Sequence, residues 1–410
     1  MDRFCSLDSY RRRVMLATLI VFFALAACNA AMFAAASAQS QVSALEVAPG
    51  VAYQVIDIET PRGTARAHVI EVDLSHPDVY VDLLYPGVVA SALPLSEMAA
   101  LSGAVAAVNG DFFNISATQA GVVPTNAPVG PAIASGVVLK AAVPTRQRFG
   151  PSLPLGASVD DVIGVGEDGV ARVARLTLHG TIVTPEGVYP LAGLNQYAIA
   201  QRGIGAFTSD WGSVSRRRAT CGTDSRREDP CSVNVFEVIV TDGRVASVSD
   251  QPGEGEIPDG SVVLLGRETG ADRLRTLRLG DPVSIEYELR STVDVPFRFA
   301  VGGQPLVRDG GAVPGLDNQV AAVRSAAGIS PDGLTLYLFS LERGKSGMTY
   351  AEVASLLLSL GASSGVNLDG GGSSTLVVRD EIGGGITAVN LAPGEAERRI
   401  PNGIGVFVRP

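Results

Sequence analysis

Short stretches in which apolar and polar residues alternate open the mature part of the chain. Residues 53–58, 65–73 and 79–84 are rich in β-branched side chains and mostly alternate, which is typical of strands with one buried face. Residues 335–341, near the other end of the chain, are another short and mostly apolar stretch. These four segments are therefore predicted to be strands.

Two segments have a helical pattern instead. Residues 94–102 predict a short helix that ends at Gly103, and the apolar run 104–108 predicts a buried strand that leads into Asn109.

The second helix is predicted for residues 349–360. Thr349 and Glu352 have the spacing of a capping box, the apolar residues share one face, and Gly361 ends the pattern.

The middle of the chain, residues 165–290, consists of short apolar stretches separated by Gly/Asp turns, which indicates an all-β module. We therefore predict a mixed α/β (α+β) domain formed by residues 51–150 and 291–410. A β-rich insertion at 151–290 interrupts it, and a polar linker at 39–50 precedes it.

Export is predicted from the first 38 residues. Three arginines, Arg11 to Arg13, precede an apolar run at 14–27, as in a signal peptide. Cleavage is expected after Ala38, or before Cys28 at a sequence that looks like a lipobox, in which case a lipid on Cys28 would attach the protein to a membrane. A membrane span is the less favoured interpretation, because no second long apolar stretch follows.

The charge and the cysteines agree with an extracytoplasmic protein. The formal net charge is -10, and removal of residues 1–38 leaves 28 basic against 40 acidic residues, which makes nucleic acid an unfavourable partner. Cys221 and Cys231 are predicted to form a local disulfide. A zinc site is the competing interpretation, but the three histidines lack the spacing of zinc ligands.

One local pattern occurs twice: a helix, a glycine, a short apolar strand, and then Asn-x-Asp. It ends at Asn109 and Asp111 in the first copy and at Asn367 and Asp369 in the second. Residues i and i+2 of a strand project to the same side, so each copy presents an amide and a carboxylate together. Coincidence also explains so short a match. We expect both copies to end strands of one sheet and to meet in one cleft.

Three glycines follow the second copy. Their backbone freedom suits a close approach or a positive φ, and the amides of the loop are predicted to line an anion-binding concavity. A tight hairpin loop with a capping aspartate explains the same residues without a ligand. The loop comprises Gly370, Gly371, Gly372 and Ser373.

Six blocks in order along residues 51–407 make the chain resemble the phosphodiester glycosidase family. The blocks are 107–114, 300–310, 324–328, 347–354, 367–374 and 397–402. Each block alone is weak evidence, whereas their order makes the match specific. The resemblance implies an enzyme that hydrolyses a sugar-1-phosphodiester, such as one of an N-acetylglucosamine-like sugar, on an envelope or extracellular polysaccharide.

The chemistry of such an enzyme requires a carboxylate and a group that stabilises the leaving phosphate. Asp369 is the candidate catalytic carboxylate and Asp111 its partner. Arg324 is the candidate phosphate clamp, because a guanidinium binds phosphate in a bidentate way, and Arg398 or Arg399 would assist it.

The remaining candidates bind substrate. Asn109 and Asn367 are expected to orient the sugar or its phosphate, together with the Gly370–Ser373 loop. Members of the family often have Asp-Gly-Arg after the Arg324 block, where this chain has a shortened loop. Either Glu342 replaces that aspartate, or the site itself has changed. No cofactor is expected, although a cluster of carboxylates also suits a divalent cation.

Two other functions compete with the glycosidase. One is a catalytically silent envelope protein that binds polysaccharide, and the other is a phosphodiesterase on the same scaffold. The presence of Asp369 and Arg324 favours an enzyme. The products separate the two reactions, because a phosphodiesterase leaves phosphate on the sugar and a glycosidase releases a reducing sugar.

Overall fold

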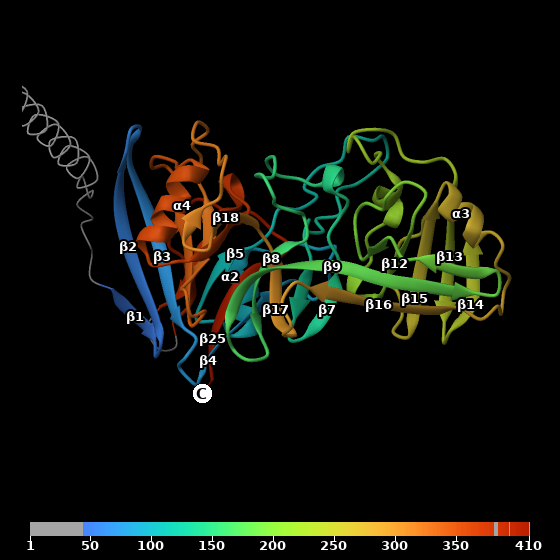
Figure 1. Cartoon of the computed structure of the whole chain (residues 1–410), viewed down its shortest axis with the longest axis horizontal. Helices are drawn as coiled ribbons and strands as arrows, with labels where there is room; N and C mark the ends of the chain where they lie inside the picture. The colour runs from blue at the N-terminus through green and yellow to red at the C-terminus, as the bar shows by residue number, and fades with distance from the viewer. Residues whose placement is uncertain (1–43, 381–383, 393, 410) are drawn as a thin grey trace, which may run out of the picture. The chain divides into compact units, whose positions relative to one another are not determined.

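The structure is a computed structural model that describes residues 44–380, 384–392 and 394–409. It consists of sheets whose strands are almost all antiparallel, as Figure 1 shows. The predicted signal peptide, the alternative lipidation site at Cys28 and residues 39–43 of the predicted linker lie outside the described residues. Within the described ranges, no helix has the length and apolar character needed to cross a membrane.

The eight-stranded sheet contains the most N-terminal strands and the second Asn-x-Asp segment. Its order is β1 (Leu45–Ala48), β2 (Val51–Thr60), β3 (Gly63–Asp73), β21 (Thr335–Leu341), β20 (Ser325–Ile329), β22 (Ser364–Asn367), β18 (Gln304–Arg308) and β19 (Gly311–Ala312). Helix α4 (Tyr350–Ser359) packs against β18 of this sheet.

A five-stranded sheet contains the first Asn-x-Asp segment. Its order is β24 (Ile386–Ala388), β23 (Leu376–Arg379), β5 (Ala106–Asn109), β25 (Gly403–Val408) and β4 (Val79–Leu84). Helix α2 (Leu95–Ser102) lies beside it, and Gly103 ends that helix with a φ of 78°.

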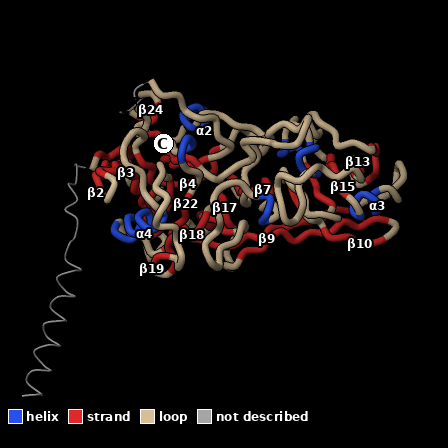
Figure 2. The backbone as a smooth tube through the Cα atoms, turned by 90° about the horizontal axis from the view of Figure 1, so that it is seen from above, coloured by secondary structure: helices blue, strands red, loops and turns tan. Residues whose placement is uncertain are grey.

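The other two sheets are formed mostly by the middle of the chain. The seven-stranded sheet has the order β10 (Gly187–Pro190), β9 (Ala171–Thr184), β8 (Asp161–Gly166), β17 (Phe297–Gly302), β6 (Ala132–Ala134) and β7 (Val137–Lys140), with β16 (Ser284–Ser291) paired to β9. The last sheet has the order β11 (Gly193–Leu194), β12 (Ile204–Phe207), β15 (Ser261–Arg267), β13 (Val235–Thr241) and β14 (Arg244–Ser249). Figure 2 shows the long strand β9 among the loops of this region.

The predicted fold class, a mixed α/β domain, is wrong. The described residues contain three α-helices, α2, α3 (Thr269–Leu274) and α4, against 25 strands, so the fold is mostly β. Short 3₁₀ turns lie at Thr145–Gln147, Ser209–Trp211, Arg216–Thr220 and Gly371–Ser373. The two helices predicted from periodicity do form, but sheets packed on one another bury most of the apolar side chains.

The core is shared by all four sheets. Its largest cluster includes Val81 of β4, Ile163 of β8, Phe207 of β12 and Leu338 of β21, each almost fully buried. The predicted domain boundaries near residues 150 and 290 stay a prediction.

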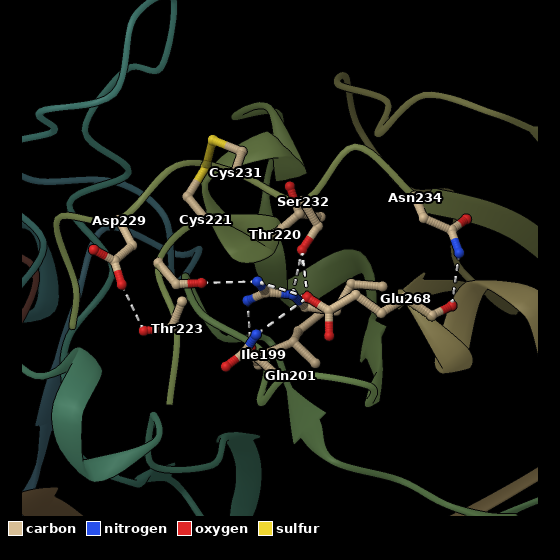
Figure 3. A network of polar contacts seen from close by, with 12 residues as sticks. Ile199, Gln201, Thr220, Cys221, Thr223, Asp229, Cys231, Ser232, Asn234 and Glu268 are labelled. Carbon is tan, nitrogen blue, oxygen red and sulfur yellow. Dashed lines mark hydrogen bonds and ion pairs between the residues drawn. A yellow bond between two sulfur atoms is a disulfide. The ribbon is translucent and has the colours of Figure 1, made fainter. Parts of the chain in front are cut away.

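The predicted disulfide between Cys221 and Cys231 is present, with an S–S distance of 2.01 Å. Figure 3 shows the polar contacts around it. Within the closed loop, the Thr223 hydroxyl donates to Asp229 at 2.8 Å. The buried Arg267 donates to the Gly222 carbonyl at 2.7 Å and so connects the loop to strand β15.

Replacing both cysteines (Cys221→Ser, Cys231→Ser) is expected to lower the free energy of unfolding by about 2 to 3 kcal/mol, since the bridge restricts a short loop of the unfolded chain. Urea denaturation of both proteins measures this loss. Free thiols at these positions in protein collected outside the cytoplasm would contradict the predicted bridge.

Candidate active site

The two Asn-x-Asp segments follow the ends of strands in two different sheets, not in one sheet as predicted. Asn109 is the last residue of β5 in the five-stranded sheet, and Asn367 is the last residue of β22 in the eight-stranded sheet. The predicted local order of helix, glycine and strand is nevertheless present at both places.

Direct hydrogen bonds bring the two segments together. Asn109 Nδ2 donates to the Asp369 carbonyl at 2.7 Å, and the Asp369 amide donates to the Gly110 carbonyl at 2.8 Å. Asn109 Oδ1 accepts from the Thr375 amide at 3.1 Å. The side chain of Asn109 therefore joins the two sheets, and its amide group is engaged by the protein itself.

Asn402 completes the junction from strand β25's side. Its carbonyl accepts from the Gly110 amide at 2.9 Å, and its Oδ1 accepts from the Asp111 amide at 3.0 Å. A Cβ atom on Gly110 would lie 2.3 Å from Asn402 Oδ1, so a glycine is needed at this point.

The carboxylate of Asp111 is buried against backbone. Its Oδ2 accepts a short hydrogen bond from the Gly130 amide. A Cβ atom on Gly302 would lie 2.4 Å from the same oxygen, so the carboxylate occupies space that only a glycine leaves free. Burial raises the pKa of Asp111, while the Gly130 hydrogen bond and the nearby cations Lys140 and Arg148 oppose that rise.

Asp369 is half-buried, and its Oδ1 accepts from the Gly370 amide at 3.0 Å. Burial raises the pKa of Asp369 to about 7, a hydrogen bond from Ser373 opposes the rise, and the charge of Asp111 adds to it. The two candidate carboxylates thus lie close enough to influence each other. A carboxyl group with a pKa near neutrality is suited to general acid–base work.

The glycine loop has a different form from the predicted hairpin, because β22 and β23 on either side of it belong to different sheets. The amides of Gly370, Gly371 and Ser373 already donate to Asp369 Oδ1, the Val323 carbonyl and the Gly370 carbonyl. These amides therefore shape the loop rather than stand free as an anion cradle.

Arginines cover the loop. Arg398 Nη1 donates to Ser373 Oγ at 3.2 Å, and a Cβ atom on Gly372 would lie 2.2 Å from Arg398 Nη2. Arg343 donates to the Ser374 carbonyl at 3.1 Å. Gly372 thus permits the close approach of Arg398, whose role was predicted. Arg398 and Arg399 are both exposed.

Asn367 presents unused hydrogen-bonding groups. Its side chain is 1% exposed, and neither Oδ1 nor Nδ2 has a partner among the described residues. Its register partner Gln304 on β18 is also buried, with Oε1 unpaired and Nε2 donating to the Ser152 carbonyl at 3.1 Å. Buried amides are usually hydrogen-bonded, so this pair is well suited to contact a polar ligand.

The predicted clamp Arg324 lies beside the glycine loop, but the protein engages its guanidinium. Its Nε donates to the Met348 carbonyl at 3.2 Å, its Nη1 to the Tyr350 hydroxyl at 2.9 Å, and its Nη2 to the Val320 carbonyl at 2.9 Å. Tyr350 also lies under the guanidinium, 4.0 Å from Cζ to the ring centroid. Arg324 therefore connects the site to the start of α4.

Glu342 has other partners. Its Oε2 lies 3.3 Å from His68 Nε2 and 3.6 Å from Arg66, and the Tyr53 hydroxyl contacts His68 Nδ1 at 2.7 Å. Its contacts are thus with residues of β3, and His68 links it to Tyr53 of β2. None of these contacts involves Asp111 or Asp369. Its predicted role in substrate binding stays a prediction.

Sequence reasoning missed several residues of the site. Arg148 and Gln304 line one small hollow together with Asp111, which was predicted, and Arg148 lies over the Phe112 ring, 5.9 Å from Cζ to the centroid. Gln304 and Asn402 belong to two of the six blocks, so their presence there was the available signal. Arg148 lies outside every block and had no such signal. None of the candidate residues lines the two grooves along β9 and β16.

Within the described ranges, no group of three or more His, Cys, Asp or Glu side chains has the arrangement of metal ligands. The functional groups described at the site are carboxylates, amides and guanidinium groups.

The model of the phosphodiester glycosidase family matches residues 234–407. Its match confirms the resemblance, and the chain contains a phosphodiester glycosidase-like domain. No match is found among curated proteins.

Solved structures share the fold. A hypothetical protein from Synechocystis is 24% identical, with a TM-score of 0.67, over 91% of this chain and 65% of its own. A Burkholderia pseudomallei protein thought to be exported is 22% identical, with a TM-score of 0.62, over 84% and 74%. The present chain therefore spans about two thirds of the Synechocystis protein.

A third structure is the zebrafish N-acetylglucosamine-1-phosphodiester alpha-N-acetylglucosaminidase catalytic domain, auto-inhibited by its pro-peptide. It is 15% identical, with a TM-score of 0.44, over 90% of this chain and 88% of its own.

The raised pKa of Asp369 predicts how stability depends on pH. A carboxyl group whose folded pKa, about 7, lies above its unfolded value favours folding while protonated and loses that advantage as the pH rises through 7. Asp369→Asn is therefore expected to raise the Tm at pH 8 and to leave it nearly unchanged at pH 4. Calorimetry at both pH values measures this, and an equal change at the two would contradict the shifted pKa.

Proposed function

We propose that this protein hydrolyses a sugar-1-phosphodiester at the site formed by Asp111 and Asp369. The observation that carries the proposal is the junction of the two Asn-x-Asp segments, which places two buried or half-buried carboxyl groups within each other's influence. The family match over residues 234–407 supports this reaction over others on a β fold.

In this proposal, Asp369 acts as the nucleophile or the base. It is the more accessible carboxyl group, and its pKa of about 7 lets it exchange a proton near neutral pH. Asp111 is the partner that is held rigidly by backbone. The leaving phosphate is a weak base, so stabilising its charge matters more than protonating it.

Two arginines are proposed to stabilise the phosphate. Arg324 was predicted for this role, but its nitrogens have protein acceptors. Arg148 has no carboxylate within ion-pair distance among the described residues. Its Nη1 donates to the Pro151 carbonyl, and its buried Nε has no partner. Both arginines lie close enough to Tyr350 to oppose the rise in its pKa that burial causes. Arg148 therefore has more N–H groups free to bind the phosphate than Arg324 has. Arg324 lies on the side of the site where α4 begins.

We also propose that the protein acts outside the cytoplasm, on an envelope or extracellular polysaccharide. The disulfide between Cys221 and Cys231 is typical of oxidising compartments, and the leader predicted from sequence agrees with export. The Burkholderia protein of the same fold is itself thought to be exported.

Asp369→Asn is expected to lower kcat by at least about a thousandfold while leaving the fold intact, since the change keeps the size of the side chain and removes its charge. The assay is release of reducing sugar from the methyl diester of N-acetylglucosamine 1-phosphate. Asp259→Asn, an exposed aspartate elsewhere, is the matched control. Full activity in Asp369→Asn would contradict the site, and phosphate left on the sugar would indicate a phosphodiesterase.

The roles of Arg148 and Arg324 are distinguished by comparing two substrates that differ in their leaving group. Arg148→Lys is expected to reduce cleavage of the phosphodiester by about 100-fold, because lysine lacks the planar fork of donors. A nitrophenyl glycoside, whose leaving group carries no phosphate, should be affected much less. The same comparison with Arg324→Lys tests the clamp predicted from sequence. For either arginine, equal losses on the two substrates would remove it from the contacts of the phosphate.

A further inference from the structure

Lys140 is a fully buried lysine beside the candidate active site. It is 0% exposed at the end of β7, and its ammonium donates to three backbone carbonyls, those of Val129, Gly130 and Ala141. No carboxylate lies within ion-pair distance of it among the described residues. Lysine is almost never fully buried unless it is paired, so this arrangement requires an explanation.

The chain makes little use of lysine elsewhere. Its 32 basic residues comprise 30 arginines and two lysines, Lys140 and the exposed Lys345. An ammonium is compact and has three donors, which matches the three carbonyls around Lys140, whereas a planar guanidinium would not fit them in the same way.

One peptide group links Lys140 to Asp111. The Val129 carbonyl accepts from Lys140 Nζ at 3.3 Å, and the amide of the same peptide group, Gly130 N–H, donates to Asp111 Oδ2. A positive charge at the carbonyl end polarises the peptide and strengthens the N–H as a donor at its other end. The peptide thus transmits the charge of the ammonium to the carboxylate.

The glycines around this peptide permit the contact. A Cβ atom on Gly130 would lie 2.6 Å from Gly302 Cα and 3.0 Å from Asp111 Oδ2. The two backbones and the carboxylate are therefore packed without room for any side chain, which keeps solvent from screening the pair.

We propose that Lys140 is a positioning residue that holds Asp111 in place and in its ionised form through the Val129–Gly130 peptide. This inference rests on the proposed function only for its effect on catalysis. The link between Lys140 and Asp111 itself is a property of the folded protein.

Other charged groups face the pair and must be taken into account. Arg148, Tyr197 and Asp369 influence Asp111, and Asp160 influences Lys140. Burial lowers the pKa of Lys140 to about 7, and the charges of Asp111 and Asp160 oppose that fall. Removing Asp111 is therefore expected to lower the pKa of Lys140 further, and removing Lys140 to raise the pKa of Asp111.

The two lysines allow a direct test that needs no substrate. Protein labelled with ¹³C at the lysine ε-carbon gives two side-chain NMR signals, and Lys345→Met assigns them. The Lys140 signal is expected to titrate near neutrality in the otherwise unchanged protein. In Asp111→Asn its midpoint is expected to fall by about one pH unit, while in Asp57→Asn, which removes a carboxylate near Lys345, it should not move. An unchanged midpoint in Asp111→Asn would overturn the proposal.

The effect on catalysis is read from the pH profile. Lys140→Met is expected to shift the acidic limb of kcat/KM upward by about one pH unit, because Asp111 then protonates at higher pH. Lys140→Arg, which keeps the charge, should restore part of the shift, and Lys345→Met should have none. A uniform loss of activity without a shift would reduce Lys140 to a stabilising residue. The Lys140 midpoint could fall in Asp111→Asn although the protein cleaves no phosphodiester. That result would reject the proposed function and still support the link between Lys140 and Asp111.

Discussion

The candidate site depends on the hydrogen bonds that join the ends of β5 and β22. Asn109 Nδ2 donates to the Asp369 carbonyl, and Asn109 Oδ1 accepts from the Thr375 amide. The Asp369 amide in turn donates to the Gly110 carbonyl. The two sheets share a hydrophobic core, and these hydrogen bonds fix the ends of the two strands relative to each other at the site. Because each bond is buried or nearly so, breaking one leaves a polar group without a partner, and such a loss is costly.

The surroundings of this junction also explain how two carboxyl groups, Asp111 and Asp369, can be buried or half-buried beside it. Burial disfavours the charge of both carboxyl groups, and the protein offsets this with amide donors and cations rather than with direct ion pairs. Gly130 and Gly302 let the backbone approach Asp111, and Gly372 lets Arg398 approach the loop after Asp369. In the sequence these glycines look like turn residues. In the structure they let backbone and charged side chains pack closely together.

Sequence patterns predicted the local elements well and the fold class poorly. Strand β21 has the predicted bounds, and α4 begins with the predicted capping box between Thr349 and Glu352. Both rest on short-range periodicity and capping, which neighbouring residues determine. The mixed α/β class was wrong because it depends on how many apolar faces are covered by sheets instead of helices, and this is decided by contacts between distant segments.

The sequence by itself determined the two Asn-x-Asp segments, the paired cysteines, the capped helix and the resemblance to a family of glycosidases, since each is legible in residues close together or in ordered blocks. Only the tertiary structure decided that the two segments end strands of different sheets and that Asn109 is engaged in joining them. It also decided that Arg148 and Lys140 lie beside Asp111 while Glu342 lies with His68. The physical reason is that burial and long-range contact set the charge, hydrogen bonds and partners of a polar side chain, and these are absent from the local pattern in which it occurs.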